Sequence, residues 1–433
     1  MAGYIFVTVG SVSNFREVPF SYQNKILRRK LSALAVADIE RLHSVLFAPH
    51  TLSEKDIKII TEISKSQKCT ILRSPSFGIY DFHYEIRFQP LVFYYLYHFL
   101  QFYDLPVEQE LQSNKFYVDV SVGLNQLTFA MLEAFRFLRI FSELLNLGIS
   151  QKKKPKFYMI YSEPVLGRNV EEWHNYRVYR ETFKPKAFLS LPISWEDRKD
   201  LFISVESLPL TEEVKVKFRN IVENAILTIS AVIKNIPLAV YLLGYDSPRD
   251  ILNFINSFIE DLKPIMGNEI EPPAFEIDTK ERKLGYLYSK GNINFRLLNN
   301  SILLLGFYFG ISKLLERYGV PKEGNKDVSI RELLKKFSEI YRLIYKGDNP
   351  SEVLLEKDVN RLDDLTRGRM PINSWIGGEK IDKEHGRKTV GLRHFIAHSG
   401  LLTNLLEFNV QNGRIRYKPN KKDEIKQLLC SLS

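Results

Sequence analysis

The stretch YIFVTVGSVSN, residues Tyr4–Asn14, begins with an apolar run and ends in a polar loop opened by a glycine. The run Tyr4–Val9 is short and rich in β-branched and aromatic residues, which predicts a buried β-strand. The loop Gly10–Asn14 follows it directly. In open α/β sheets, ligands bind just beyond the carboxyl ends of the strands. We therefore expect Tyr4–Val9 to be the first strand of such a sheet and its loop to be a candidate binding segment.

Five similar runs follow in the first half of the chain, at residues 44–49, 69–74, 116–121, 156–162 and 187–192. Helical patterns separate them, near residues 22–41, 53–66, 84–102 and 124–147. Strands that alternate with helices are typical of a parallel sheet with crossover connections. The sequence thus predicts a Rossmann-like α/β domain with a parallel-rich sheet over residues 1–192.

The second half of the chain has a mostly helical pattern, for example at residues 211–235 and 250–263. Two prolines within Gly267–Asp278 suit a connecting segment, and residues 283–295 predict a hairpin that turns at Lys290–Gly291. We expect a mainly helical linker region over residues 193–293 and a helical domain over residues 294–433. The predicted fold class is α/β plus all-α.

The charge and cysteine content limit the classes of function and compartment. Lys and Arg number 61 against 51 Asp and Glu, and this net charge of +10 favours an anionic partner such as RNA, DNA or a nucleotide. The two cysteines, Cys69 and Cys430, supply neither a disulfide framework nor a thiolate metal site. Together with an N-terminus that lacks the features of a signal peptide, this predicts a cytoplasmic protein.

The aromatic stretch Ile86–Asp104 comes nearest to a membrane span. Polar residues and a proline interrupt it before it reaches the ~20 apolar residues that a span requires. We expect a helix that is buried or faces a second copy, and no membrane partner.

Two polar loops follow predicted strands. The second, DVSVGLNQ at Asp119–Gln126, leads into a long helix whose first N–H groups and dipole favour an anion. Two such loops at one sheet edge indicate a polyphosphate or oligonucleotide ligand; alternatively, their Ser and Asn residues are only helix caps and turn formers. The candidate ligand-binding residues are Gly10, Ser11, Ser13, Asn14, Ser121, Gly123, Leu124, Asn125 and Gln126.

The stretch GLRHFIAHSG, Gly391–Gly400, holds two of the eight histidines of the chain and an arginine within six residues. Its apolar residues have helical spacing, which predicts an amphipathic helix over residues 391–406. At 100° per residue, Arg393 and His398 lie about 140° apart, so both border one cleft only if the cleft wraps the helix or a second copy completes it.

These side chains suit RNA cleavage without a metal ion. A histidine can move protons near neutral pH, and an arginine can hold phosphoryl oxygens while negative charge builds in the transition state. The ribose 2′-hydroxyl would attack its own phosphate and leave a 2′,3′-cyclic phosphate. Arg393, His394 and His398 are therefore the candidate catalytic residues, and no metal ligand set is expected.

The segment RHFIAHSG resembles the R-x4-6-H motif of HEPN ribonucleases. Its position late in a chain that opens with a Rossmann-like domain resembles the CARF-HEPN ribonucleases of type III CRISPR systems. DVSVGLN is similar to the family's D-x-T-H-G-x-N ligand motif at Asp119, Gly123 and Asn125, with Ser121 in place of Thr and Val122 in place of His. GSVSN occupies the position of the family's other ligand loop.

The resemblance implies a CARF sensor dimer that binds a cyclic oligoadenylate, with the tetra-adenylate expected, and a HEPN dimer that cleaves single-stranded RNA in antiviral defence. Val122 in place of histidine removes any role that this side chain would have. Two other readings stay open: a nucleotide sensor that binds nucleic acid or protein without cleaving it, and a ribonuclease without a ligand switch.

Overall fold

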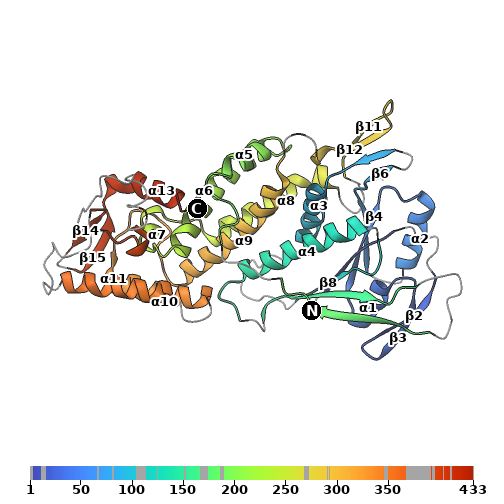
Figure 1. The fold of residues 1–433 in the computed structure, drawn as a ribbon, viewed down its shortest axis with the longest axis horizontal. Coiled ribbons are helices and arrows are strands. Elements are labelled where there is room, and N and C mark those ends of the chain that lie inside the picture. Colours follow the sequence, from blue (N-terminus) through green and yellow to red (C-terminus); the bar gives the residue numbers. More distant parts are fainter. Residues whose placement is uncertain are drawn as a thin grey trace, which may run out of the picture.

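The structure is a computed structural model. It describes residues 3–10, 16–65, 68–79, 82–103, 114–123, 125–150, 153–165, 174–185, 190–267, 273–289, 291, 293–345, 350–366, 392, 395–402, 404–409 and 412–432. Figure 1 shows an elongated molecule with a large sheet at one end, long helices in the middle, and the small strands β14 and β15 with helices α10 and α11 at the other end.

The large sheet has the strand order β3-β2-β10-β9-β8-β1-β4-β5. Its centre is parallel, as predicted, and consists of five strands: β1 (Gly3–Thr8), β4 (His43–Pro49), β5 (Cys69–Ser74), β8 (Lys115–Asp119) and β9 (Lys156–Ser162). The chain winds from β1 outward to β4 and β5, and then returns to place β8 on the other side of β1. The topological switch point, where ligands bind in such sheets, therefore lies between β1 and β8.

Helices cover both faces of this sheet. In β1, the side chains of Ile5 and Val7 pack in one core with α1 (Ser32–Glu40) and α2 (Glu54–Ser64). The side chain of Phe6 points to the other face and packs with α3 (Phe88–Gln101) and α4 (Asn125–Leu145). Alternation along the strand thus supplies both cores. The aromatic helix α3 is buried, as expected for that stretch.

The helix predicted over residues 22–41 is wrong in its first half. Residues Val18–Tyr22 (β2) and Lys25–Arg29 (β3) form an antiparallel hairpin, and only Ser32–Glu40 is helical. Gln23 and Asn24 both have positive φ, 49° and 62°, which gives the tight turn that matches the twist of a hairpin. The local turn geometry outweighs the helical spacing of the apolar residues.

Of the strand predicted at residues 187–192, the described residues 190–192 contain no strand, and residues 187–189 lie outside the described residues. The sixth long strand is β10 (Tyr176–Thr182), which runs antiparallel to β9. Tyr176 and Val178 are buried, whereas Arg177, Tyr179 and Arg180 are exposed. A strand with one solvent-exposed face lacks the continuous apolar run of a buried parallel strand. For this reason the sequence pattern did not predict β10.

The second half is helical, as predicted, with α5 (Arg198–Glu206), α6 (Glu212–Ile233), α7 (Leu238–Leu243), α8 (Pro248–Met266), α9 (Phe295–Arg317), α10 (Ile330–Tyr345), α11 (Pro350–Thr366) and α13 (Lys422–Cys430). Among the described residues, α9 alone has the length and hydropathy of a membrane span, but 89% of its most apolar window is buried inside the protein. It is a core helix of this fold.

Two smaller sheets interrupt the helices. One has the order β11-β12-β7-β6, with β11 (Phe275–Asp278), β12 (Lys283–Tyr286), β7 (His83–Glu85) and β6 (Gly78–Ile79). The predicted hairpin over residues 283–295 is therefore wrong: β12 pairs with the preceding β11, and a 3₁₀ turn at Leu287–Ser289 leads to α9. The observed turn lies at residues 279–282, where Arg282 has a φ of 52°.

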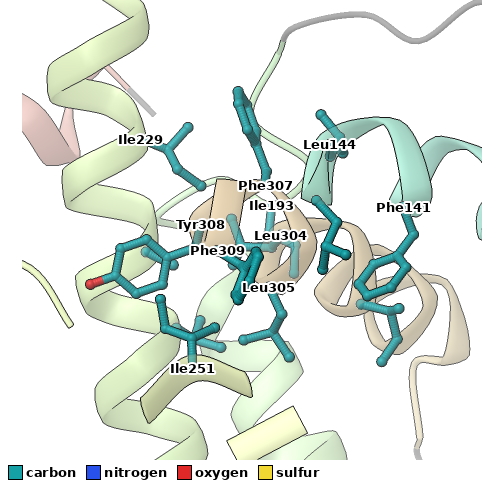
Figure 2. Close-up of a cluster of buried hydrophobic side chains, with 14 of the residues drawn as sticks. Phe141, Leu144, Ile193, Ile229, Ile251, Leu304, Leu305, Phe307, Tyr308 and Phe309 are labelled. Carbon is teal, nitrogen blue, oxygen red and sulfur yellow. The ribbon is translucent and has the colours of Figure 1, made fainter. Parts of the chain in front are cut away.

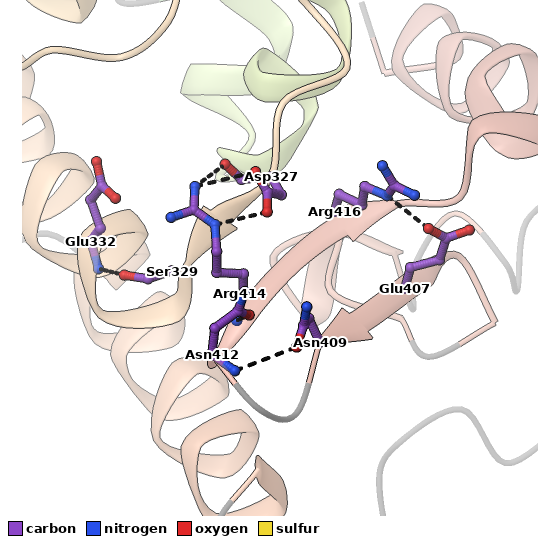
Figure 3. A network of polar contacts seen from close by, with 8 residues as sticks. All are labelled: Asp327, Ser329, Glu332, Glu407, Asn409, Asn412, Arg414 and Arg416. Atoms are coloured by element: carbon purple, nitrogen blue, oxygen red, sulfur yellow. Dashed lines mark hydrogen bonds and ion pairs between the residues drawn. The ribbon is translucent and has the colours of Figure 1, made fainter.

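The third sheet has the order β13-β15-β14, with β13 (Val328–Ser329), β14 (Leu406–Asn409) and β15 (Arg414–Tyr417). Its outer face carries paired charges (Figure 3): Arg414 Nε lies 2.8 Å from Asp327 Oδ2, and Arg416 Nε lies 2.7 Å from Glu407 Oε2. These pairs leave the face electrically balanced.

Helices α4 and α9 cross at two glycines of α9. A Cβ at Gly306 would lie 2.5 Å from Cδ2 of the Phe141 ring, and a Cβ at Gly310 would collide with the carbonyl oxygen of Leu144. Figure 2 shows Phe141 and Leu144 of α4 beside Leu304 and Leu305 of α9. The missing side chain at Gly310 lets the backbones of the two helices approach closely, and the missing side chain at Gly306 makes room for the Phe141 ring.

Candidate functional site

The two loops at the switch point come together. The Cβ position of Gly10, after β1, lies 3.9 Å from the Cα of Gly123, after β8. The proximity of the two predicted ligand segments follows from the placement of β1 beside β8. Ser11, Ser13, Asn14 and Leu124 lie outside the described residues.

Position 123 can be occupied only by glycine. Its φ is +108°, and a Cβ there would collide with Thr8 Oγ1 and lie 2.9 Å from Thr128 Oγ1. The same two hydroxyls are 3.5 Å and 3.3 Å from the carbonyl oxygen of Val122. Thr8 at the end of β1 and Thr128 in α4 thereby hold the loop after β8.

The carboxylate of Asp119 holds this loop in place through hydrogen bonds. Its carboxylate is buried and accepts hydrogen bonds from the Ser121 backbone N–H and the Ser32 hydroxyl, both at 2.8 Å. Burial raises the pKa of Asp119, while hydrogen bonds from Ser121, Ser32 and Ala33 oppose the shift. Ser121 Oγ also accepts the N–H of Ser162 at 2.8 Å, which ties the loop to β9. In this structure Ser121 thus shapes the loop.

Among the described side chains of these two loops and the first turn of α4, those of Asn125 and Gln126 are exposed and available to a ligand. Gly10 and Gly123 contribute backbone without side-chain bulk. This combination of N–H groups, a helix N-terminus and amide side chains suits phosphate and nucleobase edges.

The second candidate site lies at the other end of the molecule, around His398. Arg393 and His394 lie outside the described residues. The helix predicted over residues 391–406 is wrong beyond Ala397: Ser399 and Gly400 have φ values of 52° and 73°, and Leu406 begins β14. The Gly400 N–H donates to the Phe395 carbonyl at 2.7 Å, a hydrogen bond typical of a glycine helix cap. His398 therefore sits in a helix-ending turn.

Asp358 of α11 faces this histidine and was missed at the level of sequence. His398 Nδ1 lies 3.5 Å from Asp358 Oδ1, and Asp358 is only 3% exposed. Burial raises the pKa of Asp358, and the neighbouring His398 and Ser399 oppose that shift. An acid at position 358 sits on the same helix stripe as the buried residues Leu355, Val359 and Leu362, and such a placement signals a buried polar partner.

Hydrogen bonds from a residue just after α6 and from β15 hold the turn in place. Asn235 Nδ2 donates to Ser399 Oγ at 2.9 Å, and the Tyr417 hydroxyl donates to the Gly400 carbonyl at 2.9 Å. Nδ1 of His398 faces the Asp358 carboxylate, an arrangement by which an acid can orient an imidazole for proton transfer. In the described part of the chain, no group of three or more His, Cys, Asp or Glu side chains is placed to hold a metal ion.

Comparison with known proteins addresses the first site. Residues 4–164 match the family model described as "CRISPR system endoribonuclease Csx1, CARF domain". The match runs from β1 to the end of β9 and includes both switch-point loops. The N-terminal domain is a CARF domain. No curated protein matches the chain. The helical half that follows the CARF domain, including His398 and Asp358, lies outside the matched residues.

Proposed function

We propose that the protein is a CRISPR-associated endoribonuclease that a cyclic oligoadenylate activates and that degrades single-stranded RNA in antiviral defence. In this proposal the CARF domain within residues 1–192 is the sensor, residues 193–293 are the linker region, and residues 294–433 are a HEPN ribonuclease domain. The alternative, a sensor that binds nucleic acid without cleaving it, differs in what His398 does.

The observation that carries the nuclease assignment is the placement of His398 against the buried Asp358. A carboxylate at Nδ1 stabilises the imidazolium that forms when Nε2 takes up a proton. A histidine that served only as a phosphate contact would not need a buried acid, whose desolvation costs free energy. The pair therefore favours proton transfer over simple binding.

The proposed reaction needs two proton transfers and no added reagent. The 2′-oxygen forms a bond to phosphorus as its proton leaves, and the bond from phosphorus to the 5′-oxygen breaks as that oxygen gains a proton. His398 moves these protons, Arg393 stabilises the charge on the phosphoryl oxygens, and His394 orients the RNA. The products are a 2′,3′-cyclic phosphate and a 5′-hydroxyl, and no metal ion is required.

A homodimer suits both sites. A cyclic tetra-adenylate has an even number of units and can therefore have a two-fold axis. Two copies of the Gly10 and Gly123 loops can bind it around that axis. Gly10, Ser11, Ser13, Asn14, Ser121, Gly123, Leu124, Asn125 and Gln126 are the proposed contacts. Two copies of the HEPN domain would likewise combine Arg393 and His398 in a composite site.

The test is RNA cleavage by the purified protein in EDTA, with cyclic tri-, tetra- or hexa-adenylate added. We expect activation by the tetra-adenylate, and a rate about 10²–10⁴-fold lower in His398→Ala. Asp358→Asn should also slow cleavage and shift its pH profile, because the orienting charge is lost. The matched controls are the exposed His174→Ala and, on α11, the exposed Glu356→Gln.

Undiminished cleavage by His398→Ala and Arg393→Ala would contradict the nuclease assignment. Sedimentation that shows a fully active monomer would contradict the composite site.

A further inference from the structure

A groove of about 1240 Å³ lies between the four-stranded sheet and the first turns of α3 and α9. Its lining includes Arg87 and Phe88 at the start of α3 and Arg296 at the start of α9. None of these residues belongs to the switch-point loops or to the His398 turn. The groove is therefore a separate feature whose occupant has to be inferred from its own chemistry.

The charge in the groove is positive. Arg87 and Arg296 are exposed, and neither has a hydrogen bond or ion pair with another residue in the ranges that the structure describes. Glu85, the acid in the lining, has its Oε1 3.8 Å from both His83 Nδ1 and Lys283 Nζ. Lys283 lies closer to Glu281, at 2.7 Å, so it is shared between two acids. The lining nevertheless holds two arginines against the single carboxylate of Glu85, which makes the local potential positive.

The groove also offers an aromatic platform. Phe88 is 44% exposed, so its ring is accessible to a ligand, and it follows Arg87 directly. Its neighbour Gln89 is held in place, since its Oε1 accepts a hydrogen bond from Asn299 Nδ2 at 3.2 Å. Gly78, Gly285 and Gly291 line the groove without side chains, so they leave room beside this platform.

We propose that this groove is an exosite for single-stranded RNA, in which Arg87 and Arg296 contact phosphates and a base stacks on Phe88. Cationic grooves with aromatic platforms are the usual means by which proteins hold single strands without reading their sequence. An acidic peptide would satisfy the two arginines but would leave the stacking surface unused. The inference rests on the proposed function, because the strand bound here is the substrate cleaved at His398.

The exosite and the His398 turn lie at opposite ends of α9. The groove is at its first turn, and the segment after its last turn bonds to α7 through Asn325 N and Leu242 O, at 3.0 Å. Helix α7 follows Ile236, whose side chain lies against Gly400. Figure 1 likewise places β6 and β12 far from β14 and β15.

This separation sets a length requirement for the RNA. The 23 residues of α9 span roughly 34 Å at 1.5 Å per residue. A stacked strand advances about 3.4 Å per nucleotide, so roughly 10 nucleotides are needed to reach from one site to the other. A stacked RNA of six nucleotides spans only about 20 Å and does not reach both sites.

The experiment measures binding in the full-length His398→Ala protein, so that the RNA stays intact. Fluorescently labelled single-stranded RNAs of 6 and 30 nucleotides are titrated at several salt concentrations. For the 30-mer, Arg87→Gln with Arg296→Gln should raise Kd about tenfold or more. It should also lower the slope of log K against log salt by about 1.4, since each single-strand phosphate contact contributes about 0.7. Phe88→Ala should raise Kd about fivefold to a hundredfold, as expected for one lost stack.

The control variant is Arg249→Gln, an exposed arginine at the start of α8 outside the groove, and it should leave Kd and slope unchanged. An unchanged Kd and slope for the double variant with the 30-mer would overturn the exosite. Equal displacement of the 30-mer by polyglutamate would overturn the assignment to RNA.

Failure of the proposed nuclease gives a different result. If the wild-type protein does not cleave, binding of the 30-mer still reports on the groove. If it does cleave, the double variant should raise KM for the 30-mer and leave cleavage of the 6-mer unchanged. An equal loss for both lengths would contradict a remote exosite.

Discussion

His98 of α3 is a fully buried histidine, packed against aromatic rings. Its ring centroid lies 4.5 Å from that of Tyr94 and 4.9 Å from that of Tyr97, and Nδ1 contacts Gln101 Oε1 at 3.2 Å. Burial lowers the pKa of His98 from 6.5 to about 4. The folded protein therefore holds this side chain neutral where the unfolded chain protonates it.

This pKa difference predicts acid sensitivity of stability. Between pH 6.5 and pH 4 the unfolded state binds a proton at His98 that the folded state does not bind. The free energy of unfolding therefore has its full value above pH 6.5 and decreases as the pH falls through this range. At pH 5 the loss from His98 is roughly 2 kcal/mol, at about 1.4 kcal/mol per pH unit. Urea unfolding at pH 7 and pH 5 should show a smaller pH dependence in His98→Phe than in the wild type.

The control for this measurement is His174→Phe, because His174 is exposed. His50, whose pKa burial also lowers to about 4, keeps part of the acid sensitivity in both variants. An identical pH dependence in wild type and His98→Phe would show that His98 does not titrate in this window.

At the level of elements, the crossing of α4 and α9 links the two halves of the chain. Helix α4 begins at Asn125 in the candidate ligand loop, and its last turns meet Gly306 and Gly310 of α9. Helix α9 belongs to the same buried core as α6, and Asn235 beyond α6 bonds to Ser399 beside His398. Every step of this connection is a packed or hydrogen-bonded contact.

The close crossing of α4 and α9 predicts that Gly→Ala, a substitution that usually stabilises a helix, destabilises the protein at Gly310. Gly→Ala inside a helix usually gains about 1 kcal/mol. At Gly310 the new Cβ would meet the Leu144 carbonyl oxygen, which cannot move without its helix, so we expect Gly310→Ala to lose about 1–3 kcal/mol. Thermal unfolding measures this, with Ser257→Ala on the exposed side of α8 as the control. A gain in stability would mean that the helices are not in close contact.

At the level of the whole molecule, the proposed sensor and nuclease sites lie in different parts of the chain. Asn125→Ala should therefore raise the concentration of cyclic tetra-adenylate needed for half-maximal activation, on the order of tenfold, because each copy loses one hydrogen bond. The rate at saturating activator should stay near that of wild type. Titration of RNA cleavage against activator measures both values.

Asn253→Ala, at an exposed position of α8, is the matched control and should leave the titration unchanged. Loss of cleavage at saturating activator in Asn125→Ala would contradict the division into sensor and nuclease, because it would place Asn125 in the chemistry.

The local pattern of apolar residues in the sequence was sufficient to predict many of the strands and helices of the fold. The five parallel strands, the buried α3 and the long helices α4, α6 and α8 were all predicted, because each buries a continuous apolar run or stripe that the sequence displays directly. The placement of polar loops after the first and fourth predicted strands followed in the same way. The matched CARF model covers residues 4–164, which include the five parallel strands, α3 and α4.

Only the tertiary structure decided the rest. The approach of Gly10 to Gly123, of Gly310 to Leu144 and of His398 to Asp358 joins segments that are far apart along the chain. The hairpin β2–β3 and the half-exposed strand β10 depend on a turn conformation and on a neighbouring strand rather than on their own periodicity. Local periodicity reports which face of an element is buried, whereas the identity of the partner across that face is set by the packing of the whole chain.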